Sequence, residues 1–183
     1  MTRKLQARGN AGREVAAVLL RAAIGGTMIA HGVKHGRSLA GTAGWFSSIG
    51  FRRPRLQARA SAVVEVGAGA LMVMGAATPL ASAAVVGTMG VAGRAVHASN
   101  GFFITAEGWE YVANLAVGAV ALAGIGPGRF SVDRATGADR RLSGAQAAAV
   151  AGGLGAAAAA GQLAMFHRPA VPAPEGEAPP EKS

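Results

Sequence analysis

The chain has 183 residues, of which 51% are apolar and 15% charged, and its formal net charge is +9. Long apolar segments without broad polar faces exclude a soluble helical domain, and the absence of period-two alternation in them argues against a β-barrel. Cysteine is absent, which excludes disulfides, thiolate metal sites and dithiol redox chemistry of the chain's own.

Four apolar segments predict membrane-spanning helices, because about 20 mostly apolar residues cross the hydrocarbon core of a bilayer. They are residues 14–36, 57–76, 79–98 and 109–125. The sequence therefore predicts an all-α polytopic membrane helix bundle. Its four core helices lie within a domain of residues 14–133, preceded by a basic N-terminal tail at 1–13.

A fifth apolar segment, residues 143–166, consists largely of alanine and glycine. Small residues recur in it at every fourth position, which predicts a face for close packing on another helix. These residues are Gly144, Ala148, Gly152, Ala156 and Ala160. We expect this segment to be a fifth transmembrane helix, with a helix on the surface as the alternative. The proline- and glutamate-rich residues 169–183 predict a disordered tail.

The positive charge lies mainly in the predicted termini and loops. No nucleic-acid-binding motif accompanies it, so we expect contacts with membrane lipid and no nucleic-acid partner. The residues concerned include Arg3, Lys4, Arg8, Arg13, Arg52, Arg53, Arg55, Arg140 and Arg141. Their distribution favours a cytoplasmic N-terminus. The loop at 37–56, which contains Trp45 and Phe46, is expected to dip into the membrane interface.

Ionisable residues occur at matching ends of the four predicted core helices. They are His31, Lys34, Glu65, Arg94, His97 and Glu110. In an up-and-down bundle these ends lie on one side, so the residues should gather near one membrane face. An unpaired charge at membrane depth costs about 3 kcal/mol or more, which makes such residues candidates for a functional site or for locked ion pairs. The short turn near Thr78 places Glu65 and Arg94 at similar depths and predicts an ion pair between them.

Several short motifs follow one another between about Leu19 and Asp133. They are Ala30-His31-Gly32 with Lys34, Glu65 in a glycine-bearing helix, His97 before Asn100-Gly101-Phe102-Phe103, Gly108-Trp109-Glu110-Tyr111, and Gly126-Pro127-Gly128-Arg129-Phe130-Ser131-Val132-Asp133. Their order resembles the DoxX family of small four-helix bacterial membrane proteins, which is related to the membrane subunit of thiosulfate:quinone oxidoreductases. The family pattern does not explain Arg21.

Three interpretations of the ionisable cluster remain open. The first is an ion pair of Glu65 and Arg94 that only locks two helices together. The second is a quinone pocket in which His31, Glu65 and His97 supply hydrogen bonds and protons, with Trp45, Trp109 and Tyr111 near its entrance. The third takes His31 and His97 as ligands of a haem iron. It is less favoured because the family resemblance does not imply a haem. No metal site is expected.

The resemblance implies a quinone-interacting membrane subunit of an oxidoreductase system in the bacterial cytoplasmic membrane. His31, Glu65, Arg94, His97 and Glu110 are the residues expected to bind the cofactor, and a soluble oxidoreductase is the expected partner. The chain lacks cysteine and a soluble domain where thiosulfate might bind, so no catalytic residue is assigned and enzymatic activity stays open. The alternative is a non-catalytic membrane anchor or scaffold for a soluble redox or lipid-handling partner.

Overall fold

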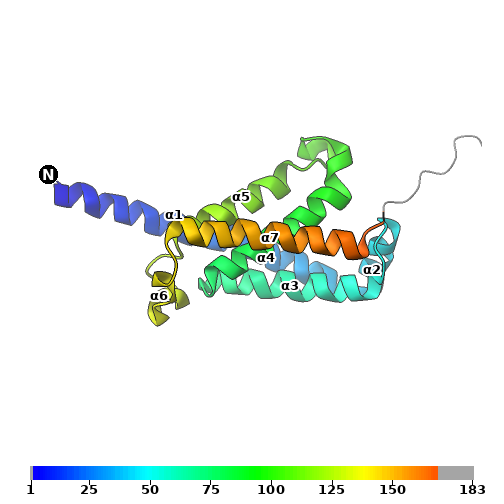
Figure 1. Cartoon of the computed structure of the whole chain (residues 1–183), viewed down its shortest axis with the longest axis horizontal. Helices are drawn as coiled ribbons and strands as arrows, with labels where there is room; N and C mark the ends of the chain where they lie inside the picture. The colour runs from blue at the N-terminus through cyan, green and yellow to red at the C-terminus, as the bar shows by residue number, and fades with distance from the viewer. Residues whose placement is uncertain (1, 169–183) are drawn as a thin grey trace, which may run out of the picture.

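The computed structural model describes residues 2–168, with side chains from Asn10 onward, and these residues form an elongated bundle of helices without a strand (Figure 1). The helices are α1 (Thr2–Arg37), α2 (Leu39–Ser48), α3 (Pro54–Met74), α4 (Thr78–Ala92), α5 (Glu110–Ile125), α6 (Val132–Thr136) and α7 (Gly144–Phe166). The expected disordered tail at 169–183 lies outside the described residues. The chain is thus an all-α membrane helix bundle, as its composition predicts.

Four of the helices are long and apolar enough to cross a membrane. They are α1 from Asn10 onward, α3, α4 with its extension to Asn100, and α7. The helix expected at 109–125 is present as α5, but its 16 residues span about 24 Å, less than the roughly 30 Å of hydrocarbon. At the other extreme, α1 begins at Thr2 instead of residue 14 and projects beyond the other helices in Figure 1.

The expected interfacial loop at 37–56 is largely helical, because half of it forms α2 and its last residues belong to α3. Ala43 and Phe46, which are three residues apart and therefore on one face of α2, are both buried. Phe46 packs in one apolar cluster with Phe51 and Ala58, so α2 closes the end of the bundle against the start of α3.

The end of α4 departs from a regular α-helix. Residues Gly93–His97 form a π-helical turn, and Ala98–Asn100 form a 3₁₀ turn. A π-helical turn follows an i→i+5 pattern and often occurs at functional sites. The side chains of Arg94 and His97 are therefore not spaced as they would be in a regular α-helix.

Glycines allow α1 and α3 to cross closely. A Cβ atom on Gly25 would lie 2.7 Å from the Gly69 carbonyl oxygen, and a Cβ atom on Gly69 would lie 2.6 Å from the Gly25 carbonyl oxygen. Only glycine fits at both positions without moving a backbone. This close approach sets the rotation of both helices and hence the faces that carry His35 and Glu65.

Small residues also mediate the packing of α7, and the face that is buried most deeply lies next to the predicted one. The buried residues of α7 are Ala147, Ala151, Gly155 and Ala159, each one position before a member of the predicted series. Gly155 meets α4 directly, since a Cβ atom there would lie 2.5 Å from Val86 Cβ. The first members of the predicted series pack on α5 instead, since a Cβ atom on Gly124 would lie 3.6 Å from Ala148 Cβ. Both faces consist of small residues, so the sequence alone does not show which of them meets α4.

Arg21, which the family pattern leaves unexplained, is buried with 8% of its surface exposed. Its guanidinium donates to four carbonyl oxygens, those of Met72 (3.2 Å), Val73 (2.5 Å), Pro127 (3.0 Å) and Phe130 (2.7 Å). Arg21 thereby joins α1 to the last turn of α3, whose carbonyls have no partner within the helix, and to the segment after α5. Its role is structural, at the end of the bundle far from the predicted ionisable cluster.

Candidate functional site

A cavity of about 810 Å³ lies where the C-terminal part of α1 approaches α2, α3, α4 and α5. The ionisable or hydrogen-bonding side chains along it include His31, Lys34, His35, Glu65, His97, Glu107 and Tyr111. Three of the predicted site residues, His31, Glu65 and His97, therefore line one space. Arg94 and Glu110 do not line it.

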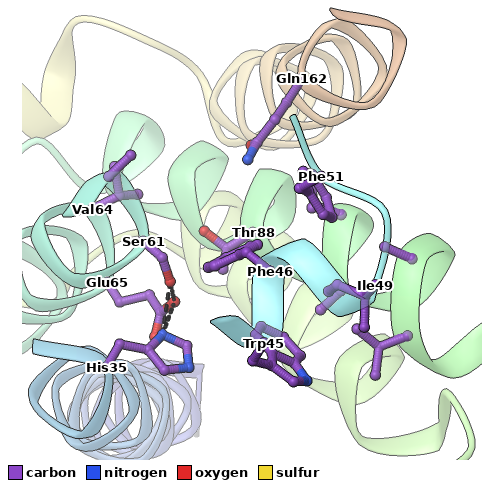
Figure 2. A pocket seen from close by; sticks show the side chains of 15 residues that line it. His35, Trp45, Phe46, Ile49, Phe51, Ser61, Val64, Glu65, Thr88 and Gln162 are labelled. Carbon is purple, nitrogen blue, oxygen red and sulfur yellow. Dashed lines mark hydrogen bonds and ion pairs between the residues drawn. The ribbon is translucent and has the colours of Figure 1, made fainter. Parts of the chain in front are cut away.

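A second cavity, of about 120 Å³, adjoins the first, because His35, Trp45 and Glu65 line both. Figure 2 shows this smaller cavity, with the polar groups on one side and aromatic side chains of α2 beside them. Its remaining wall is mainly apolar and includes Phe46, Ile49, Phe51, Val64 and Val91, while Gln162 reaches in from α7. The two cavities together offer a polar compartment next to an apolar one.

The polar groups shared by the cavities centre on His35. Its Nδ1 atom lies 3.1 Å from Glu65 Oε1 and 2.7 Å from Ser61 Oγ, and the Ser61 hydroxyl donates to the same carboxylate oxygen. Because the Ser61 hydroxyl donates its hydrogen to Glu65, both the Ser61 oxygen and the Glu65 oxygen are acceptors toward His35, so the hydrogen of the neutral imidazole lies on Nδ1 and points between them. The opposite nitrogen, Nε2, has no hydrogen-bond partner among residues 10–168, whose side chains the structure describes. Glu65, itself buried, therefore orients His35 and leaves Nε2 free for a ligand.

Aromatic rings restrict the position of the His35 imidazole. The Trp45 ring stacks on it with 6.1 Å between centroids and 29° between planes. His31 meets it edge-on at 6.4 Å. Trp45, expected near the entrance of a pocket, is thus in contact with the polar centre, and its position on α2 makes that helix part of the cavity wall.

His97 lies on the opposite wall and has partners for both ring nitrogens. Its Nδ1 donates to the Glu107 carbonyl oxygen at 2.6 Å, which leaves Nε2 to accept from the Tyr111 hydroxyl at 3.3 Å. Tyr111 is therefore held in place at the cavity by His97. His97 could donate a hydrogen bond to a ligand, as predicted, only if one of these two hydrogen bonds broke.

The other two predicted site residues have different environments. Arg94 is exposed, and the described residues contain no ion pair between it and Glu65, whose partner is His35. The predicted Glu65–Arg94 pair is therefore wrong, because it assumed regular α-helical spacing where the chain forms a π-helical turn. The Glu110 carboxylate accepts from the Ile104 backbone N–H at 3.0 Å, which stabilises the turn before α5.

Sequence reasoning missed His35, although a signal for it exists. His35 follows His31 by four residues and Ser61 precedes Glu65 by four, so each pair shares one face of its helix. A histidine face on α1 opposite a serine–glutamate face on α3 is the pattern that would have indicated the observed site.

Double-mutant cycles distinguish the observed partner of Glu65 from the predicted one. We expect His35→Ala and Glu65→Gln to show a coupling free energy of about 1 kcal/mol or more in thermal unfolding of the detergent-purified protein, as groups in one hydrogen-bond network do. Arg94→Gln should combine additively with Glu65→Gln, because the two side chains do not meet. Coupling of Glu65 to Arg94 instead of His35 would contradict the structure.

Part of the chain matches a known protein family. Residues 16–98 match the family model described as DoxX. The matched range begins within α1 and ends just after α4, so it contains His35 and Glu65. Tyr111 and α7 lie outside it. No curated protein and no solved structure matches the chain.

Proposed function

Because residues 16–98 place this chain in the DoxX family, we propose that it is a quinone-interacting membrane subunit of an oxidoreductase system in the bacterial cytoplasmic membrane. The observation that carries the proposal is the free Nε2 atom of His35 in the cavity, with Nδ1 held by the buried Glu65 carboxylate. A histidine oriented in this way can exchange one proton with a ligand while its other nitrogen keeps its hydrogen.

The chemistry of a quinone suits this arrangement. In its protonated form His35 donates from Nε2 to a quinone carbonyl oxygen. That proton would pass to the carbonyl oxygen when the partner supplies two electrons, and neutral His35 would then accept a hydrogen bond from the new hydroxyl at the same nitrogen. The second proton would reach the other carbonyl oxygen from water, because the hydroxyl hydrogen of Tyr111 is already donated to His97.

The size and lining of the cavities suit a ligand with a polar head and an apolar tail. A volume of about 810 Å³ lies within the usual range of ligand pockets, roughly 300–1,000 Å³. The head ring would occupy this space beside His35 and Trp45, and the adjoining apolar cavity would take the first part of an isoprenoid tail. The electrons would come from a soluble oxidoreductase partner, because this chain has no cysteine.

Ligand-dependent stability tests the proposal. A short-chain quinone that binds only the folded protein should raise its melting temperature in detergent, and at about 100 times the dissociation constant the gain is about 2.7 kcal/mol. His35→Ala should abolish this shift, because the group that contacts the carbonyl is lost. His167→Ala, which removes a histidine that lines neither cavity, should leave the shift unchanged. If folded protein shows no shift with any quinone, the anchor or scaffold role replaces this proposal.

A further inference from the structure

A cavity of about 490 Å³ lies at the other end of the bundle from His35. The first turn of α4, the end of α5, residues 138–142 and the first half of α7 surround it. It belongs to neither of the cavities described above, and no residue is shared with them. Its lining combines buried polar atoms, two arginines and apolar side chains.

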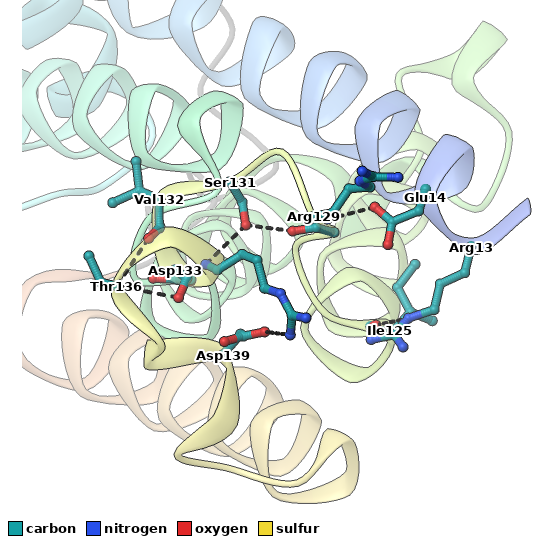
Figure 3. Close-up of polar contacts among 11 residues, drawn as sticks. Arg13, Glu14, Ile125, Arg129, Ser131, Val132, Asp133, Thr136 and Asp139 are labelled. Atoms are coloured by element: carbon teal, nitrogen blue, oxygen red, sulfur yellow. Dashed lines mark hydrogen bonds and ion pairs between the residues drawn. The ribbon is translucent and has the colours of Figure 1, made fainter. Parts of the chain in front are cut away.

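Two buried polar atoms along this cavity have no hydrogen-bond partner among the described residues. One is the hydroxyl oxygen of Thr78, whose side chain is 1% exposed, and the other is Oδ1 of Asp139. The second oxygen of Asp139 accepts from the Arg134 guanidinium at 2.9 Å (Figure 3). Leaving a buried polar atom unpaired costs about 1–3 kcal/mol. The neighbouring Asp133 differs, because its two oxygens accept from the backbone N–H groups of Ala77 and Thr78 at 2.7 and 2.8 Å.

Cationic groups with unused donors also line the cavity. Arg13 donates from Nε to the Ile125 carbonyl oxygen at 2.6 Å, as Figure 3 shows, and its terminal nitrogens have no further acceptor among the described residues. The guanidinium of Arg141 likewise has no acceptor among them. Both arginines are exposed, so their free donors are available to a ligand at the mouth of the cavity, whereas Asp139 Oδ1 is buried without a donor.

The apolar part of the cavity extends to the surface of the bundle. Leu80 is 58% exposed and Leu142 is 39% exposed, and Val150 continues this side along α7. In a membrane bundle such side chains face lipid. A ligand that satisfies the whole cavity must therefore carry an anion and a cationic donor at one end and apolar chains at the other.

We propose that this cavity binds the head group of a phospholipid that carries both a phosphate and a primary ammonium group, as phosphatidylethanolamine does. The phosphate accepts charge-assisted hydrogen bonds from Arg13 and Arg141, and the ammonium donates to Asp139 Oδ1. The Thr78 hydroxyl donates to a phosphate or ester oxygen. The acyl chains then lie along Leu80 and Val150 between α4 and α7.

Lipid-dependent melting of the full chain in detergent, without quinone, tests this proposal. Phosphatidylethanolamine should raise the melting temperature more than phosphatidylcholine, whose quaternary ammonium has no N–H to donate, and more than phosphatidylglycerol, which has no cation. Equal shifts with the three lipids would overturn the assignment of the ammonium to Asp139. Soluble phosphoethanolamine should give a much smaller shift, and an equal one would overturn the lipid as the source of the head group.

Matched variants locate the site. Arg141→Gln should raise the apparent dissociation constant for phosphatidylethanolamine about tenfold or more, the factor that corresponds to the loss of one charge-assisted hydrogen bond. Arg140→Gln removes the same charge from the adjacent exposed residue, which does not line the cavity, and should have little effect. Asp139→Asn should remove the preference for phosphatidylethanolamine over phosphatidylcholine. Equal effects of the two arginine variants would overturn the site, and none of these outcomes depends on quinone binding at His35.

Discussion

Replacing Arg21 by methionine is expected to lower the free energy of unfolding by about 3–5 kcal/mol, the range typical of removing one side of a buried charged network. The side chain donates to four carbonyl oxygens contributed by α3 and by the segment after α5. Methionine fills similar space but removes all four donors, and of the four carbonyls the Met72 oxygen still accepts from the Gly75 backbone N–H. Thermal or chemical unfolding of the detergent-purified protein measures the loss.

Two further variants control for charge and for position. Arg21→Lys keeps the charge, yet a single ammonium cannot reach all four carbonyls as the planar guanidinium does, so an intermediate loss is expected. Arg140→Met removes an arginine that is exposed and should change stability by less than about 0.5 kcal/mol. If Arg21→Met were as stable as Arg140→Met, the network around Arg21 would not hold the bundle together.

Gly69→Ala is expected to destabilise the bundle by about 1–3 kcal/mol, the usual effect of overpacking a tight contact. The added methyl group would lie 2.6 Å from the Gly25 carbonyl oxygen, so α1 and α3 would have to separate. Such a separation would also move His35 away from Glu65. We therefore expect Gly69→Ala to weaken any ligand binding at His35 together with stability.

Gly67→Ala provides the matched control for this prediction. Gly67 lies two residues earlier in the same helix, and a Cβ atom there would have nothing within 4 Å. The variant should be as stable as the parent or slightly more stable, because alanine favours the helix. Equal melting temperatures for the two variants would mean that the close crossing of α1 and α3 is not needed for stability.

The candidate site could be predicted in part. Connectivity alone requires the end of one helix and the start of the next to lie on the same side of an up-and-down bundle. The gathering of His31, Glu65 and His97 around one cavity follows from this order. Which side chains pair within the cavity does not follow from this order. A shift of one residue turns a helical side chain by about 100° and brings it next to a different neighbour.

One wrong prediction and one undecided packing face have this same origin. Arg94 was expected to pair with Glu65, but it lies in a π-helical turn and points elsewhere, while His35 takes its place. On α7, two adjacent faces both consist of small residues, so periodicity could not decide which one packs on α4. In each case depth along the helix was predictable and rotation about its axis was not.

What the sequence determined by itself was the membrane bundle, the approximate positions of its five long apolar helices and the end at which the ionisable residues gather, since hydropathy and chain order are local properties. Only the tertiary structure decided that His35 is the partner of Glu65 and that Arg21 joins α1 to distant carbonyls. These contacts depend on how closely α1 can approach α3 at Gly25 and Gly69. That approach is a property of two surfaces in contact, which neither segment of sequence shows alone.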